Sequence, residues 1–304
     1  MERRNFIKSA LTGAAALGAT SFVPGGLTEI FGQKALSNRE ERIQTKKKIY
    51  IHTDLEGISG IDRGEMVPND SPDYRYCVER LMADTNAAVD GAFLGGATHV
   101  TVLDSHGGGN NFDLSLLDKR AEFDTKPNKQ WWGIIDESYW GTFFIGAHAM
   151  AGTLNGFLDH TQSSATIYNW YINGRKVGEL AQWAMVCAHY NVPLIMMSGD
   201  TAAVAEAAQF FSGIETADVK TGISRNRAKL IPNDIALEKI RHAAKTAVEK
   251  SESPPMFKPL LPMEVKIEYM RGDYCDNVAN KPNVERLDAR TVRKISTSYQ
   301  DFRI

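Results

Sequence analysis

Cysteine is scarce in this sequence. Its 304 residues include three cysteines, Cys77, Cys187 and Cys275, and no two of them form a CxxC pair. Because three thiols cannot all pair within one chain, we do not expect a disulfide framework. Cys187 lies in the apolar run AQWAMVCAHY, so we expect it to be a small buried hydrophobic side chain.

Net charge is also low, and several other features are missing. The formal charge of -2 at pH 7 and the isoelectric point of about 6.4 argue against a general nucleic-acid-binding protein. The sequence has no internal repeats, and beyond the N-terminal segment no apolar run is long enough to span a bilayer. A hydrophobic content of 43% is ordinary for a globular protein, and the length allows one large domain or two modest ones.

The N-terminal segment has the composition of an export signal. It begins MERRNFIK, with Arg3 next to Arg4, and continues as an apolar stretch from Ala10 to about Val23. Paired arginines before a mildly apolar core are typical of twin-arginine signals, and an ordinary secretory signal is the alternative. Either signal predicts a periplasmic or extracellular protein, unless the signal is retained as an anchor. The expected divisions are an export signal with the start of a linker (1–37), a polar linker (38–47) and the main domain (48–304), with a β-rich part from about residue 255.

Strand-like and helix-like segments alternate along the main domain. Apolar, β-branched runs predict strands, and apolar residues at helical spacing predict helices. The expected strands are 48–53, 99–103, 142–145, 194–200, ADVKTGIS and MEVKIEYM, and the expected helices are 73–94, 178–190, 201–211 and 233–250. A hairpin should turn at Asn173-Gly174. This alternation predicts a three-layer α/β/α fold with a largely parallel sheet.

Three of the expected strands end in side chains that bind metal ions in other proteins. Asp54 and Glu56 follow the first strand, Asp104 and His106 follow the second, and His148 follows the third. Taken alone, Asp54 and Glu56 fit the solvated end of a strand equally well. In an open α/β sheet, however, ligands bind beyond the carboxyl ends of the strands, where all these groups fall. Mixed carboxylates and imidazoles favour zinc, manganese or cobalt over calcium, and this many candidates suits two ions that share a carboxylate.

Two further interpretations concern the segment after the second strand. Asp104 is either a ligand or a carboxylate that orients a histidine, and we favour the second role. The glycines of HGGGN suit the oxyanion hole of a serine esterase, but the GxSxG motif that such enzymes also need is absent. We therefore expect these glycines to let the backbone pass close to the metals or to cradle a substrate terminus.

Five short motifs resemble a known family. The chain is similar, in the order and spacing of these motifs, to the zinc-dependent D-aminopeptidases of the DppA family, once named dipeptide transport proteins. The motifs are TDLEGISG, LDSHGGGNN, GAHAMAG, FLDHTQS and YINGRKVGEL. The resemblance runs from about Lys48 to Arg227 and more weakly to the C-terminus. It implies an α/β fold with a smaller α+β second lobe, two Zn²⁺ ions per subunit with Mn²⁺ or Co²⁺ as substitutes, and ring-shaped homo-oligomers.

The resemblance also implies roles for individual residues. The family's metal ligands fall on Asp54, Glu56, His106, His148 and Glu179. Its catalytic histidine falls on His160, as a nucleophile or a proton shuttle. Without the resemblance, Glu179 is only an acid whose charge favours a helix N-terminus.

The predicted function is therefore that of an exported, metal-dependent aminopeptidase. Its substrates would be short peptides with an N-terminal D-amino acid, and it would have no nucleic-acid partner and no membrane span in the mature chain. D-specificity follows only from the resemblance, because stereochemistry is set by the shape of the pocket. Two alternatives stay open: a metal-dependent hydrolase of another small amide or ester, and a non-catalytic peptide- or metal-binding protein, which would not need His160.

Overall fold

Sheet A, a seven-stranded sheet, is the centre of the fold. The structure is a computed structural model that describes residues 46–127, 129–250 and 252–304, so the predicted export signal lies outside the described residues. The strand order is β3-β2-β1-β4-β7-β8-β9, and every neighbouring pair is parallel except β8 with β9. These strands are β1 (Lys48–Thr53), β2 (His99–Asp104), β3 (Ala121–Phe123), β4 (Gly141–Ala147), β7 (Leu194–Asp200), β8 (Glu215–Ser224) and β9 (Arg227–Leu230).

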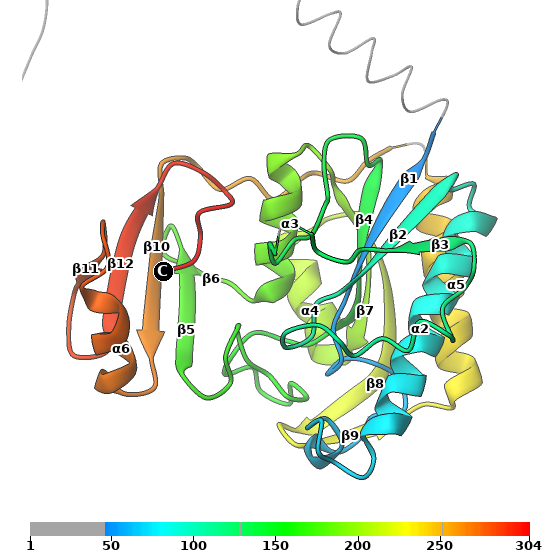
Figure 1. Cartoon of the computed structure of the whole chain (residues 1–304), viewed down its shortest axis with the longest axis horizontal. Helices are drawn as coiled ribbons and strands as arrows, with labels where there is room; N and C mark the ends of the chain where they lie inside the picture. The colour runs from blue at the N-terminus through cyan, green and yellow to red at the C-terminus, as the bar shows by residue number, and fades with distance from the viewer. Residues whose placement is uncertain (1–45, 128, 251) are drawn as a thin grey trace, which may run out of the picture. The chain divides into compact units, whose positions relative to one another are not determined.

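Helices cover both faces of sheet A. On one face, α2 (Tyr74–Leu94) and α5 (Asn233–Glu249) lie side by side and share a core with Ile49 and Ile51 of β1 (Figure 1). On the other face, α3 (Glu179–His189) and α4 (Thr201–Phe210) share a core with Tyr50 of the same strand. The predicted three-layer α/β/α fold is therefore confirmed. Within the described residues, no helix combines the length and the apolar character needed to cross a bilayer.

Sheet B, an antiparallel sheet of five strands, forms the smaller lobe. Its order is β11-β12-β10-β5-β6, and the short helix α6 (Gly272–Ala279) packs against β10 and β12. The predicted hairpin is confirmed, because Asn173 and Gly174 both have positive φ, 49° and 76°, as a two-residue turn requires. The strands are β5 (Ile167–Ile172), β6 (Arg175–Lys176), β10 (Met263–Tyr269), β11 (Glu285–Arg286) and β12 (Thr291–Ser296).

Aromatic side chains join the two sheets. The imidazole of His52 packs 4.3 Å from the ring of Trp183, and the fully buried Phe302 packs 5.8 Å from Trp131 and 6.0 Å from Trp170, all between ring centroids. Burial lowers the pKa of His52 to about 3, so this histidine is a neutral core residue. Cys187 is also buried, as expected. This aromatic core fixes sheet B against the face of sheet A that carries α3.

Candidate metal centre

The loop that follows β1 is in direct contact with the end of β4. The backbone N–H of Gly57 donates to the carbonyl oxygen of Gly146 at 2.8 Å. A Cβ on Gly57 would lie 2.1 Å from a backbone oxygen of the β4 segment, and a Cβ on Gly146, where φ is +80°, would lie 2.1 Å from the carbonyl oxygen of Asp54. These two glycines therefore bring Asp54 and Glu56 against the chain segment that carries His148.

The loop after β2, which carries His106, is fixed by Asp104. The Asp104 carboxylate accepts hydrogen bonds from the amide side chain of Asn111 at 2.8 Å and from the backbone N–H of Phe112 at 3.2 Å. The Asn111 amide also donates to the carbonyl oxygen of His106 at 2.8 Å. In the described structure Asp104 thus orients the loop through Asn111 and holds the backbone of His106 rather than its imidazole.

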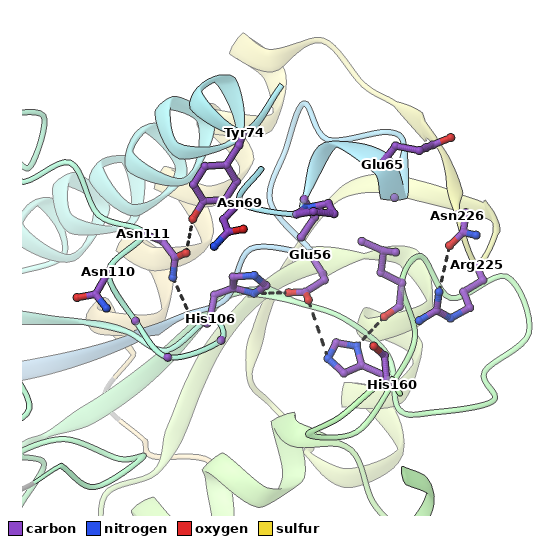
Figure 2. Close-up of a pocket in the computed structure, with 18 residues that line it drawn as sticks. Glu56, Glu65, Asn69, Tyr74, His106, Asn110, Asn111, His160, Arg225 and Asn226 are labelled. Atoms are coloured by element: carbon purple, nitrogen blue, oxygen red, sulfur yellow. Dashed lines mark hydrogen bonds and ion pairs between the residues drawn. The ribbon is translucent and has the colours of Figure 1, made fainter. Parts of the chain in front are cut away.

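The predicted ligand side chains converge beyond the strand ends. His106 Nδ1 lies 3.0 Å from Asp54 Oδ1 and 2.9 Å from Glu56 Oε2. His148 Nε2 lies 3.4 Å from Asp54 Oδ2 and 3.4 Å from Glu179 Oε1. Figure 2 shows the imidazole of His106 and the carboxylate of Glu56 pointing toward each other. Glu179 reaches this place from the first turn of α3, and its carboxylate accepts the backbone N–H of Gln162 at 2.8 Å.

His160 lies beside the same groups. Its Nε2 is 3.9 Å from Glu56 Oε1 (Figure 2) and 3.6 Å from Glu179 Oε1. Its ring stacks on that of His148 with the centroids 3.9 Å apart and the planes at 11°. All six residues that the sequence predicts for the site are therefore within one cluster of side chains.

The imidazole of His148 is oriented as a metal ligand would be. Its Nδ1 lies 3.0 Å from the carbonyl oxygen of Ala149. A carbonyl only accepts, so Nδ1 carries a hydrogen and Nε2 is the nitrogen that can bind a metal ion. This Nε2 is buried without a hydrogen-bond partner, although Asp54 and Glu179 lie close to it. A buried ring nitrogen that faces two carboxylates fits a cation placed between them.

Charge balance in the cluster points to the same conclusion. Burial lowers the pKa of His106, but the attraction of Glu56 and hydrogen bonds to both nearby carboxylates outweigh burial and raise this pKa to about 11. Burial raises the pKa of Asp54, and the nearby charge of Glu56 raises it further. Protons on the imidazoles therefore balance the buried carboxylates here, and metal cations can take the place of those protons.

Two sets of donors in the described residues have the spacing of metal ligands. One set is Asp54, Glu56 and His148, and the other is His148, His160 and Glu179; within each set the donor atoms lie within 4.8 Å of one another. His148 offers one nitrogen and can bind only one ion at a time, so the two sets overlap; with His106 added, the cluster has enough donors for two neighbouring ions that share a carboxylate. His160 stands in the second set, so the geometry alone allows it to be a ligand as well as a proton carrier.

A buried lysine that the sequence analysis did not single out holds the loop carrying Glu56. Lys220 on β8 donates from Nζ to the carbonyl oxygens of Glu56, Ile58 (2.8 Å) and Ile61 (3.0 Å). An ammonium has three N–H groups, one for each of these carbonyls. Burial lowers the pKa of Lys220 to about 7, and the charge of Asp200 opposes that shift. The sequence signal was a single lysine inside the strand-like run ADVKTGIS.

A second overlooked residue, Glu206 on α4, supports the segment after His148. Its Oε2 accepts the backbone N–H of Met150 at 2.6 Å, while its Oε1 is buried without a hydrogen-bond partner. A Cβ on Gly178 would lie 2.5 Å from that Oε1, so the glycine before α3 leaves room for the carboxyl group. Burial raises the pKa of Glu206 to about 7. Glu206 therefore links the segment after His148 to the start of the helix that carries Glu179.

An open pocket of about 800 Å³ adjoins the cluster (Figure 2). Glu56, His106 and His160 line it together with glycines of the HGGGN loop. The other lining residues come from the segments around Gly64–Tyr74, the loop of Leu158–Ser164 and the turn between β8 and β9. A small molecule can thus reach the clustered side chains from solvent.

Carboxylates and imidazoles gathered at the strand ends of an α/β sheet, beside an open pocket, are the arrangement of a metallohydrolase. Residues 47–303 match the family Peptidase_M55, described as D-aminopeptidase, and the chain belongs to this family. It is an enzyme, a hydrolase of the D-aminopeptidase type, as the motif resemblance predicted.

Two relatives are similar to this chain. A D-aminopeptidase of Bacillus subtilis (strain 168) is 35% identical over 187 residues, which cover 60% of this chain and 67% of that protein. A solved structure, described as the Zn-dependent D-aminopeptidase DppA from Bacillus subtilis, a self-compartmentalizing protease, superposes with a TM-score of 0.79. It is 28% identical, and the match covers 84% of this chain and 93% of that one.

Proposed function

We propose that this enzyme hydrolyses short peptides with an N-terminal D-amino acid at a site that holds two zinc ions per subunit. The observation that carries the proposal is the pair of donor sets around His148, whose buried Nε2 has no hydrogen-bond partner. The similar solved structure, a Zn-dependent D-aminopeptidase, supports the choice of metal and substrate class. Mn²⁺ or Co²⁺ would substitute for zinc, since mixed carboxylate and imidazole donors also bind these ions.

The proposed ligands are the side chains that meet at the strand ends. When bound there, zinc ions would polarise a peptide carbonyl and lower the pKa of a water molecule. The chain itself holds the ligands in place: Lys220 fixes the backbone of Glu56, and the N–H of Gln162 fixes the carboxylate of Glu179. The five ligands are Asp54, Glu56, His106, His148 and Glu179.

His160 is the residue that we propose to carry the proton. Its Nδ1 lies 2.8 Å from the carbonyl oxygen of Leu158 and therefore carries the hydrogen, which leaves the Nε2 lone pair toward the site. Nε2 is thus placed to take a proton from an attacking water and give it to the leaving amine as the C–N bond breaks. Direct attack of Nε2 on the carbonyl carbon is the second role that this orientation allows.

The decisive experiment combines metal analysis with a release assay on one preparation. We expect about two transition-metal ions per chain, mainly zinc, because the donors exceed the needs of one ion. We also expect amine release from D-Ala-D-Ala to be much faster than from L-Ala-L-Ala. Release from both isomers alike, or from simple amides and esters only, would favour a hydrolase of another small amide or ester. Metal without release from any substrate would favour a binding protein.

We also propose that the enzyme assembles into a ring-shaped homo-oligomer. The support is the similar solved structure, which is described as self-compartmentalizing. Its partners would then be copies of itself and short peptides, and we expect neither nucleic acid nor a membrane span in the mature chain.

Export by the twin-arginine route is a separate proposal that rests on Arg3 and Arg4. This route requires the arginine pair, so a double variant, Arg3→Lys with Arg4→Lys, should stay in the cytoplasm. Fractionation of cells followed by detection of the protein makes the measurement, and the unchanged sequence is the control. Normal export of the double variant would indicate the general secretory route instead.

A further inference from the structure

Arg225 contributes a positive charge to the lining of the pocket, although it is distant in sequence from the residues of the metal cluster. It lies in the turn between β8 and β9 and lines the same pocket as Glu56 and His160. Among the pocket-lining residues in the described part of the chain, it is the single lysine or arginine. Glu65, another acid that lines the pocket, is paired with Arg227 at 2.7 Å, and Arg225 itself has a loose ion pair with Asp159, whose Oδ1 lies 3.8 Å from Nε.

The backbone of Arg225 is tied to the loop that carries His160. The N–H of Leu158 donates to the carbonyl oxygen of Arg225 at 2.6 Å, and the carbonyl oxygen of Leu158 accepts from the imidazole of His160 at 2.8 Å. Leu158 therefore connects the backbone of Arg225 to the imidazole of His160, the proposed proton carrier. Figure 2 shows both side chains on the same side of the pocket.

The guanidinium of Arg225 keeps donors available for a ligand. Its Nη1 donates to the side-chain oxygen of Asn226 at 3.1 Å, and its Nε lies 3.8 Å from Asp159, which is too far for a hydrogen bond. For Nη2 the described residues provide no hydrogen-bond acceptor. The side chain is half-exposed, so an incoming anion can reach it without moving the fold.

We propose that Arg225 binds the α-carboxylate of the residue that leaves when a dipeptide is cleaved. This inference rests on the proposed function. A zwitterionic dipeptide has its scissile carbonyl only one residue from its carboxylate, and a guanidinium pairs with a carboxylate through two parallel hydrogen bonds. Arg225 makes the enzyme prefer free dipeptides over amides of a single amino acid, which have the scissile bond and lack the carboxylate.

The test compares two substrates on two variants. Arg225→Gln should lower kcat/KM for D-Ala-D-Ala by about 10- to 100-fold, mostly through KM, since a charge-assisted hydrogen bond is lost. With D-alaninamide, which has no carboxylate, the same variant should match the unchanged enzyme within about twofold. Lys229→Gln is the matched control, because it removes an exposed cation from the same hairpin that does not line the pocket. It should leave both values unchanged.

Other outcomes overturn the inference in ways that separate it from the proposed function. An equal loss of kcat/KM with both substrates would indicate that Arg225 has a structural role. No loss with either substrate would show that Arg225 does not bind the substrate. If the unchanged enzyme cleaved neither substrate, the proposed function would fail, and calorimetric binding of D-Ala-D-Ala and its C-terminal amide would test Arg225 directly. The subsite would be supported if the unchanged enzyme bound the free acid more tightly than the amide and if Arg225→Gln removed this difference. Equal binding of the two ligands, or no detectable binding, would refute it.

Discussion

The His160→Ala variant should keep its metal ions and lose about 10²- to 10⁴-fold in kcat, the usual contribution of a general acid–base group. The reason is geometric: Nε2 of His160 faces Glu56 and Glu179 at 3.9 and 3.6 Å, while its Nδ1 is used by a backbone carbonyl. If His160 acts as a nucleophile instead, the loss should be larger. Zinc stoichiometry and amine release, measured on the same preparation, provide the readout.

A matched control is available on α5. His242 is an exposed histidine far from the cluster in sequence, so His242→Ala should leave both metal content and turnover unchanged. Loss of zinc together with activity in His160→Ala would make His160 a ligand, as the second donor set allows. Cleavage at the unchanged rate would mean that another residue carries the proton.

Removal of ligands should reduce metal content. Glu56 and His148 each belong to a donor set, so Glu56→Ala and His148→Ala should each bind fewer ions than the unchanged protein. Both variants should lose about 10³-fold or more in kcat/KM, because Lewis-acid stabilisation by a metal ion is worth several kcal/mol. Elemental analysis after dialysis against a zinc buffer, followed by the release assay, measures both effects.

The control for these variants is Glu238→Gln, which removes a surface carboxylate that is paired with Arg241 on α5. It should bind as much metal as the unchanged protein. Equal metal content in Glu56→Ala, His148→Ala and Glu238→Gln would contradict the assignment of the site. A finding of calcium alone would do the same, because histidine donors do not suit that ion.

Local patterns in the sequence were sufficient to predict the central sheet. The strands β1, β2, β4 and β7 are buried on both faces, so their sequences are largely apolar or β-branched. Short strands carried no such signal: β3 has three residues and β11 has two. The pairing of β5 with β10 joins segments about a hundred residues apart, and no local pattern encodes such a long-range contact.

Some residues of the site were also predictable from local sequence patterns, and others were not. Asp54, His106 and His148 follow recognisable strands, and parallel strands place their carboxyl ends at one edge of the sheet. Glu179 had no such marker, since an acid in the first turn of a helix is common, and only the motif resemblance indicated it. Arg225 in an exposed hairpin had none either, because its relation to His160 arises from one tertiary backbone hydrogen bond.

The contacts of Lys220 have a consequence for how the metal centre assembles. Three carbonyl oxygens around one cation are the kind of cage in which proteins hold a potassium ion, but here the cation is a side chain of the protein itself. The loop with Glu56 is thus held by an amine that is covalently part of the chain, so it cannot diffuse into the medium as a bound potassium ion can. Incoming metal ions therefore meet a loop that is already in position, and less of their binding energy is spent on ordering it.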